Sequence, residues 1–250
     1  MPPLKRKRSW SNSRPAKKKA RYYTPKNRYQ YARPAMRKET KGMDTPLTQV
    51  AAVTDDPTTN TSAVCLNLVR QGAGSWNRVG RKIYNQSLEL KGEIGYKYTR
   101  NGDNNVSLAQ LRMVVVWDAQ PNGGVIPNFS DIFGRTDQAG TETFNVYDPP
   151  RYDTMSRFTV LKDDFILPQN LVATPTGGTG NEVSCSYPIK SYIKLLNRQT
   201  VYQSSSNPST VADISTGSLL IYFRTTVTAA LHDAQFLIPD NLVARLRYTD

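Results

Sequence analysis

The chain has 250 residues and a formal net charge of +13, from 33 Lys and Arg against 20 Asp and Glu. Nearly all of this charge lies in the first 41 residues, where fifteen Lys and Arg oppose one acid, Glu39, for a net charge of +14. The other 209 residues therefore sum to −1. Such an imbalance between segments indicates a polyanionic partner.

The same sequence disfavours a secreted protein, a membrane-spanning protein and a small disulfide-rich protein. The charged N-terminus lacks the apolar stretch of a signal peptide. No apolar run approaches the roughly 20 residues that cross a bilayer, so no membrane partner is expected. Two cysteines cannot build a multi-bridge framework, and they fit a reducing compartment best.

Residues 1–41 are predicted to form a disordered basic arm, because prolines recur, apolar residues are few and like charges repel. Cations neutralise phosphates and aromatic rings stack on unpaired bases, so we predict that the arm binds nucleic acid. The predicted contacts are Lys5, Arg6, Lys7, Arg8, Trp10, Arg14, Lys17, Lys18, Lys19, Arg21, Tyr22, Tyr23, Lys26, Arg28, Tyr29, Tyr31, Arg33, Arg37, Lys38 and Lys41. The alternative is a solubilising tail, which the five interspersed aromatics disfavour.

A second function is indicated inside the arm. Lys5-Arg6, ten intervening residues and Lys17-Lys18-Lys19 have the layout of a two-part nuclear import signal, which predicts a host import receptor as a partner. The residues assigned to import are Lys5, Arg6, Lys7, Arg8, Lys17, Lys18, Lys19 and Arg21. Import and nucleic-acid binding do not exclude each other, since one cluster can serve both at different times.

Residues 42–61 are polar, uncharged or acidic, and contain Pro46 and Pro57, so they are predicted to be a linker. Residues 62–250 are then expected to form the folded domain. Its strand candidates, separated by segments rich in Gly, Pro, Asn and Asp, are Ser62–Val69, Lys82–Tyr96, Leu111–Trp117, Arg157–Leu167, Ser186–Leu196, Gln199–Gln203, Ser218–Thr228 and Leu242–Tyr248.

Three local features refine this pattern. The alternation of Lys82–Tyr96 shifts near Asn85, which suggests a β-bulge. The apolar run Leu111–Trp117 is expected to be buried on both sides, and 128–133 to be one short helix capped by Asn128 or Ser130. About eight strands with long loops and no long amphipathic helix predict a sandwich or jelly roll.

No reaction centre is predicted, and the chain is not expected to be an enzyme. His232 is the only histidine, which excludes a histidine-rich metal site, and Cys65 lies far from Cys185 in sequence. A Cys/His nucleophile pair would need His232 beside a cysteine, whereas strand cysteines are usually plain core. No catalytic residue, metal or cofactor is therefore assigned.

Two further clusters leave alternatives open. Asp163 and Asp164, with Asp118 or Asp153, would suit a divalent cation if they met, but solvated carboxylates are the favoured interpretation. A second basic group either extends the polymer-binding surface or forms ordinary surface ion pairs, and it consists of Arg70, Arg78, Arg81 and Lys82.

Several motifs, in order, resemble those of geminivirus coat proteins. The first is VRQGAGSWNRVGRKIYNQSLELKGEIG at 69–95, similar to the segment that follows the basic arm in that family. The others are LRMVVVWDAQPNG, PNFSDIFG, RFTVLKDDFIL, YPIKSYIKLLNRQTVY, TGSLLIYFRTTVT and LVARLRYTD. The resemblance covers about residues 64–250, and related patterns occur in coat proteins of other small circular single-stranded DNA viruses.

This resemblance implies an all-β fold, a single eight-stranded jelly roll of two four-stranded antiparallel sheets behind the disordered arm. It implies a homo-oligomer, an isometric shell of sixty copies or a multiple, whose arms face inward onto a single-stranded DNA genome and direct nuclear import before assembly. The expected locations are the virion and the host nucleus. The Cys and His residues that some family members carry behind the arm are missing here, so a zinc-finger-like role is not carried over.

Two rival functions remain. The first is the coat of a small RNA virus or satellite with the same fold, which the import-like signal disfavours. The second is a cellular nuclear DNA-binding protein with a β-sandwich, which would be monomeric or dimeric and prefer certain duplex sequences.

Overall fold

Strands dominate the described part of the structure, a computed structural model. It describes residues 39–47, 58, 60, 62–100, 110–121, 124–138, 140–167, 172–174, 181–203, 206–226, 233–237 and 241–250, with side chains described except in 97–100, 172–174, 181–185 and 233–237. The strands are β1 (Lys41–Pro46), β2 (Ala63–Cys65), β3 (Lys82–Arg100), β4 (Leu111–Asp118), β5 (Arg135–Thr136), β6 (Glu142–Thr143), β7 (Phe158–Ile166), β8 (Val172–Thr174), β9 (Asn181–Tyr202), β10 (Ile214–Thr216), β11 (Ser218–Thr225), β12 (Asp233–Leu237) and β13 (Val243–Thr249). Two 3₁₀ helices, η1 (Phe129–Asp131) and η2 (Val211–Asp213), lie between them.

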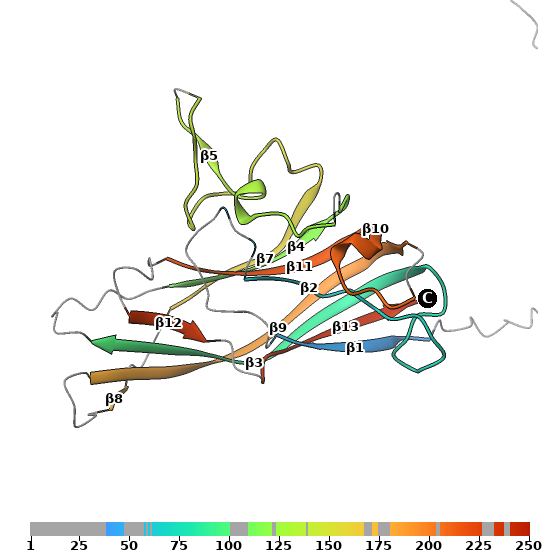
Figure 1. The fold of residues 1–250 in the computed structure, drawn as a ribbon, viewed down its shortest axis with the longest axis horizontal. Coiled ribbons are helices and arrows are strands. Elements are labelled where there is room, and N and C mark those ends of the chain that lie inside the picture. Colours follow the sequence, from blue (N-terminus) through green and yellow to red (C-terminus); the bar gives the residue numbers. More distant parts are fainter. Residues whose placement is uncertain are drawn as a thin grey trace, which may run out of the picture. The chain divides into compact units, whose positions relative to one another are not determined.

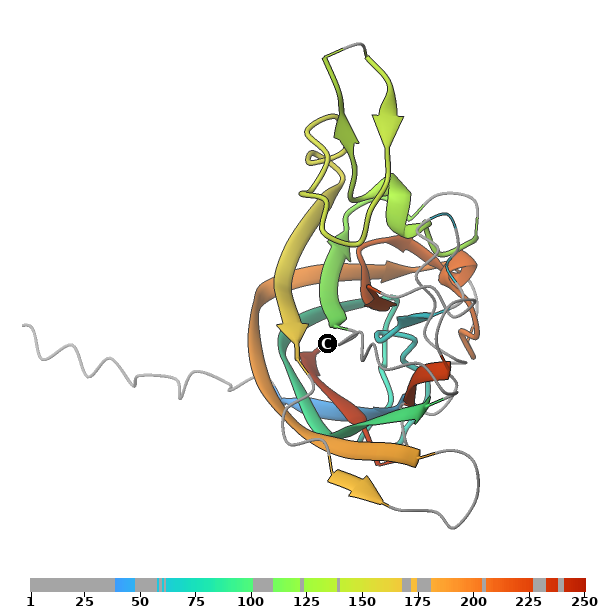
Figure 2. The same cartoon turned by 90° about the vertical axis from the view of Figure 1, so that its left-hand side faces the viewer.

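The strands form two main antiparallel sheets. One follows the order β1-β13-β3-β9-β10, with β12 added to β3 and β8 to β9, and the other follows β2-β11-β4-β7. If β1, β2, β3, β4, β7, β9, β11 and β13 are numbered one to eight in chain order, the sheets read 1-8-3-6 and 2-7-4-5. This is the strand order of a jelly roll, so the predicted eight-stranded jelly roll is confirmed. Figure 1 shows the two sheets from the side and Figure 2 shows them curling around a common interior.

The first strand corrects the predicted domain boundary. Lys41–Pro46 pairs along its whole length with β13, from Lys41 opposite Tyr248 to Pro46 opposite Val243. The linker prediction is therefore wrong for residues 42–46, which are part of the folded domain. Proline is tolerated there because β1 lies at the end of its sheet, where one side of the strand needs no ladder partner.

The predicted bulge near Asn85 is confirmed. Asn85 pairs with Arg198 and Ser87 with Lys194, so Gln86 faces three residues of β9 instead of one. Two of those three, Leu196 and Asn197, have positive φ values of 51° and 58°, a conformation that the excess residues need here. The two strands predicted at 186–196 and 199–203 are consequently one bulged strand, β9.

The sheet β2-β11-β4-β7 is covered on both faces. All eight residues of β4 and of β11 are buried, as predicted for the apolar run in β4. The outward side is covered by η1, where Phe129 and Phe133 stack with centroids 4.5 Å apart and Phe129 meets Tyr222 edge-on at 6.1 Å. The predicted short helix is thus present at Phe129–Asp131, and the Asp131 carboxylate accepts the Asn128 backbone N–H at 2.8 Å.

Arg112 fastens the long β4–β7 connection to its sheet. Its guanidinium donates to both carboxylate oxygens of Asp163, at 2.8 and 2.6 Å, and to the backbone carbonyls of Val146 and Asp148. It lies 4.3 Å from the ring centroid of Phe133. Because the charge is 98 % removed from solvent, its hydrogen bonds and ring contacts take the place of water. The connection carries the β5–β6 hairpin, which projects from the domain (Figure 1).

We predict that Arg112→Leu lowers the free energy of unfolding by about 3 kcal/mol, since it leaves a charged Asp163 and two buried carbonyls without their partner. The matched control is Lys162→Leu, which breaks a partly exposed pair with Asp164 on the same strand and should cost less than about 1 kcal/mol. Chemical denaturation of the two variants measures the difference. Equal losses would show that the buried guanidinium does not fasten the connection.

Candidate nucleic-acid interface

The predicted arm meets the described structure at one residue. Of the predicted nucleic-acid contacts, those from Lys5 to Lys38 lie outside the described residues, and so do all the residues assigned to import. Lys41, the last contact predicted, is the first residue of β1. The surroundings of Lys41 therefore define where the basic segment joins the β domain.

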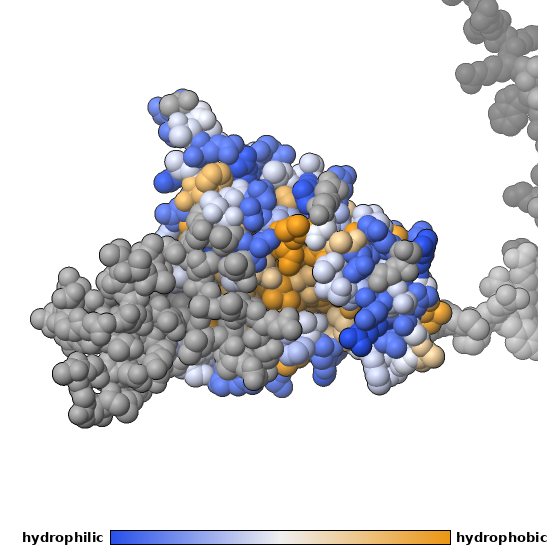
Figure 3. All heavy atoms as spheres, in the orientation of Figure 1, coloured by the Kyte–Doolittle hydropathy of each residue, from blue (hydrophilic) through white to orange (hydrophobic). Residues whose placement is uncertain are grey.

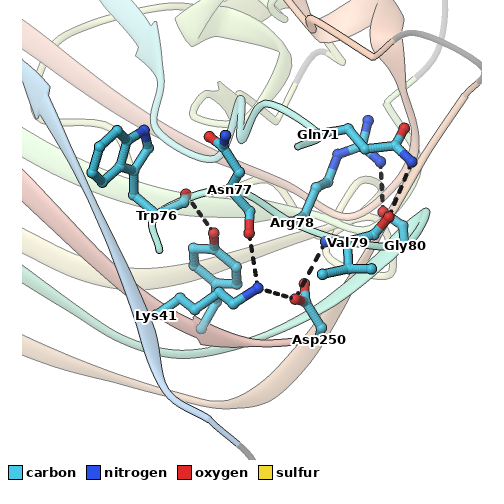
Figure 4. Close-up of polar contacts among 9 residues, drawn as sticks. Lys41, Gln71, Trp76, Asn77, Arg78, Val79, Gly80 and Asp250 are labelled. Atoms are coloured by element: carbon cyan, nitrogen blue, oxygen red, sulfur yellow. Dashed lines mark hydrogen bonds and ion pairs between the residues drawn. The ribbon is translucent and has the colours of Figure 1, made fainter. Parts of the chain in front are cut away.

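Lys41 is an anchor and not a free cation. Its ammonium is 2.6 Å from Oδ2 of Asp250 and donates to the backbone carbonyl of Asn77 at 2.9 Å (Figure 4). The residue is 8 % exposed, so a phosphate cannot reach this ammonium without breaking the ion pair. This pairing argues against Lys41 as a nucleic-acid contact, and net charge along the sequence cannot separate an anchored lysine from a solvated one.

Lys41, Tyr248 and Asp250 together hold the loop 70–81 against β1 and β13. Asp250 Oδ2 also accepts the backbone N–H of Val79 at 3.3 Å, and the Tyr248 hydroxyl donates to the Trp76 carbonyl at 2.6 Å. Burial raises the pKa of Tyr248, so the hydroxyl remains a donor at neutral pH. The Trp76 side chain is left 62 % exposed beside the root of the arm, an aromatic that the sequence pattern had not singled out.

Arg78 has an internal role in this loop. It is fully buried, donates from Nε to the Val69 carbonyl at 2.9 Å and from Nη1 to the Gly80 carbonyl at 2.6 Å, and lies 4.1 Å from the Tyr202 ring centroid. Desolvation lowers the pKa of this guanidinium and the negative charge of Asp250 opposes the shift, and the group stays charged. Of the second basic group, only Arg70, Arg81 and Lys82 are exposed and able to contact a polymer.

The acidic residues considered for a cation site are already paired. Asp118 pairs with Arg157 at 2.9 Å, Asp163 with Arg112, and the Arg151 guanidinium bridges Asp153 at 2.7 Å and Glu142 at 2.9 Å. Within the described residues, no group of three His, Cys, Asp or Glu side chains is placed to hold a metal ion.

Cys65 is part of the core. Burial raises the pKa of its thiol to about 12, and Sγ donates to Oδ1 of Asn67 at 3.2 Å. A thiol that stays protonated at neutral pH is a poor nucleophile. The side chain of Cys185 and the whole of His232 lie outside the part of the chain described with side chains.

Apolar side chains are exposed at several places on the described part of the domain, including the two that follow. A groove of about 370 Å³ beside β2 is lined by Val64, Leu68, Val125 and Ile126, among others. The β4–β7 connection exposes Tyr152 at 90 % and Met155 at 54 %. Figure 3 shows hydrophobic residues near the middle of one face, at the level of β2 in Figure 1. The described part of the chain contains no helix with the length and apolar character that crossing a membrane requires.

The arrangement is therefore a jelly roll with a basic segment joined at its first strand. The sequence model of the geminivirus coat protein/nuclear export factor BR1 family matches residues 2–238. The chain belongs to this family. As a member of a geminivirus coat protein family it is a structural protein of a virion, and its copies form a homo-oligomeric shell.

Two further comparisons accompany this family assignment. No curated protein matches the chain. Among solved structures, the VP1 protein of Trichodysplasia spinulosa-associated polyomavirus, in complex with sialylated precision glycooligomers, is 9 % identical over 84 % of this chain and 92 % of that chain, with a TM-score of 0.18. A TM-score of this size carries no argument, so the jelly-roll assignment depends on the strand order.

We predict that Lys41→Met lowers the free energy of unfolding by about 1–3 kcal/mol, because it leaves the Asp250 carboxylate without its cation. The matched control is Lys38→Met, three residues earlier and outside β1, which should leave stability unchanged and weaken single-stranded DNA binding at low salt. Thermal melts and fluorescence anisotropy measure both quantities. If Lys41→Met weakened DNA binding more than Lys38→Met and left the melt unchanged, Lys41 would be a nucleic-acid contact after all.

Proposed function

We propose that this geminivirus coat family member packages single-stranded DNA through residues 1–38 and builds an isometric shell from its jelly-roll domain. The observation that carries the proposal is the division of charge. Residues 1–38 contain fourteen Lys and Arg and no acid, whereas residues 39–250 sum to −1. Neutralising phosphates requires concentrated positive charge, and packing many copies together requires that they do not repel.

The magnitudes are consistent with a genome-binding role. Sixty copies, the number that the family resemblance implies, would carry about 840 positive charges in their basic segments, enough to offset a large share of a few thousand phosphates. The near-neutral domain adds exposed apolar side chains, including Tyr152, Met155 and Val125, of the kind that contacts between subunits bury. The exposed Arg70, Arg81 and Lys82 extend the basic segment onto the domain at its root.

Nuclear import is the second part of the proposal. Lys5 to Arg8 and Lys17 to Arg21 form two basic clusters that an import receptor can bind before assembly, and the genome takes the same charges afterwards. The family description also includes a nuclear export factor, which would move nucleic acid without enclosing it. Formation of closed particles would distinguish a coat protein from an export factor.

We predict that particles purified from cells protect their nucleic acid from added nuclease, and that the protected material is digested by DNase and resists RNase once it is released. A coat that encloses DNA gives this result because the shell excludes the enzyme. Protected material that RNase digests would favour the RNA-virus alternative, and bound DNA that stays nuclease-sensitive would favour a carrier of the export-factor kind.

We further predict that replacing Lys17, Lys18 and Lys19 with Ala keeps a fluorescent fusion in the cytoplasm, since one half of the two-part signal is lost. The matched control replaces Arg33, Arg37 and Lys38, which removes the same charge outside the signal and should leave the fusion nuclear. Confocal imaging measures the ratio of nuclear to cytoplasmic signal. An unchanged ratio in the first variant would contradict the import assignment.

A further inference from the structure

The outward side of β1, β13, β3 and β9 carries a cluster of lysines around an exposed tyrosine. Side chains alternate across a strand, so the residues that flank the buried Leu88, Leu90, Ile193 and Leu246 point away from the core. On β9 these are Lys190, Tyr192 and Lys194, all exposed, with Tyr192 at 58 %. We call this surface the outer sheet face.

Strand register places a further lysine beside them. Lys91 of β3 lies directly opposite Lys190, Glu89 opposite Tyr192, and Ser87 opposite Lys194. Directly opposed residues of an antiparallel pair have Cβ atoms about 4.5–5.5 Å apart, where two like charges are destabilising. An anion bound between Lys91 and Lys190 would therefore relieve the repulsion between their two ammonium groups.

The acids of this face are engaged elsewhere. Asp44 receives both arms of the Arg245 guanidinium, at 2.7 and 2.8 Å, and these hydrogen bonds lower its pKa. Glu89 lies 3.5 Å from Arg247. Glu93 accepts from the Ser186 hydroxyl and from the Asn241 amide, both at 2.6 Å, and these two bonds lower its pKa.

The three lysines are left as the free positive charges of this surface. Among the described residues, none of Lys91, Lys190 and Lys194 has an acidic side chain within ion-pair distance. Lys190 and Lys194 stand on either side of Tyr192 along one strand, each about 6.6 Å away. Cations that alternate with an accessible ring suit a strand of unpaired bases, whose phosphates and ring faces alternate in the same way.

The surface is also close to the root of the basic segment. Gly42, Arg247, Ser87 and Lys194 follow one another across the sheet in register, so Lys194 lies three strand spacings, about 14 Å, from β1. The outer sheet face therefore lies on the same sheet as the strand that directly follows the basic segment in the chain.

We propose that the outer sheet face is a second binding site for single-stranded nucleic acid, in which Lys91, Lys190 and Lys194 contact phosphates and Tyr192 stacks on a base. This proposal rests on the proposed function and adds to it a contact on the folded domain. The competing interpretation is that these lysines, on the part of β9 between its pairings with β8 and β10, prevent strands of neighbouring molecules from pairing with it.

The test uses the full chain, a fluorescent oligothymidylate of about 15 nucleotides and a salt titration. Lys190→Gln with Lys194→Gln should reduce the slope of log affinity against log salt by about 1.4, since each phosphate contact contributes about 0.7 for a single strand. The control removes the same charge elsewhere on the domain, at the exposed Arg135 (Arg135→Gln) and the half-buried Lys162 (Lys162→Gln), and should leave the slope unchanged. A thermal melt of each variant verifies that the fold is kept.

A second pair of variants tests whether Tyr192 stacks on a base. Tyr192→Leu should weaken binding about fivefold or more, the lower limit for loss of one stacked base. Tyr152→Leu, at a tyrosine that is 90 % exposed on the β4–β7 connection, should leave the affinity unchanged.

Two results would overturn the proposed site on the outer sheet face, and both can be distinguished from a failure of the proposed function. Equal slopes for the two charge variants would remove the lysine site, and equal affinities for the two tyrosine variants would remove the stacking contact. In both cases, replacing Lys17, Lys18 and Lys19 with Ala would still reduce the slope if the basic segment binds DNA. If that variant also left the slope unchanged, the proposed function itself would be wrong.

Discussion

The pairing of β1 with β13 is the interaction on which the architecture depends. It joins the first strand of the jelly roll to the last, and so ties Lys41–Pro46 to a sheet whose other strands come from much later in the chain. The strand has little apolar surface of its own, and it is held by its backbone ladder, by the Asp44–Arg245 pair and by the Lys41–Asp250 pair. Everything before it is a segment of fourteen positive charges, so this ladder is the mechanical link between the charged and the neutral parts of the protein.

The neutral part follows from the same division. A shell of many copies is destabilised by repulsion if each domain carries a large charge of one sign. It is stabilised when contacts between the copies bury apolar surface. The charges inside the domain are accordingly paired or enclosed, as Arg112 and Arg78 show, each surrounded by carbonyls and aromatic rings. The outer sheet face departs from this rule, because Lys91 and Lys190 oppose each other across two strands.

Much of the domain could be predicted from sequence because its strands bury regular patterns. The apolar run of β4, the alternation of β3 and its break at Asn85 all reflect packing against one core, and each was located correctly. The first strand was missed because Gly42, Asp44 and Pro46 are typical of a linker, and only pairing with β13 makes them a strand. The role of Lys41 was missed for a related reason, since its partner Asp250 is 209 residues away. The lysines of the outer sheet face likewise meet through register between β3 and β9, which local sequence does not encode.

We propose that a near-neutral jelly roll builds a container while the basic segment holds the nucleic acid. Electron microscopy of the purified chain, with and without single-stranded DNA, tests this most directly. We expect closed particles of uniform size when DNA is present, and their loss when residues 1–38 are removed and DNA is no longer retained. Monomers or dimers coating an open strand, under conditions where the DNA is fully bound, would contradict the account.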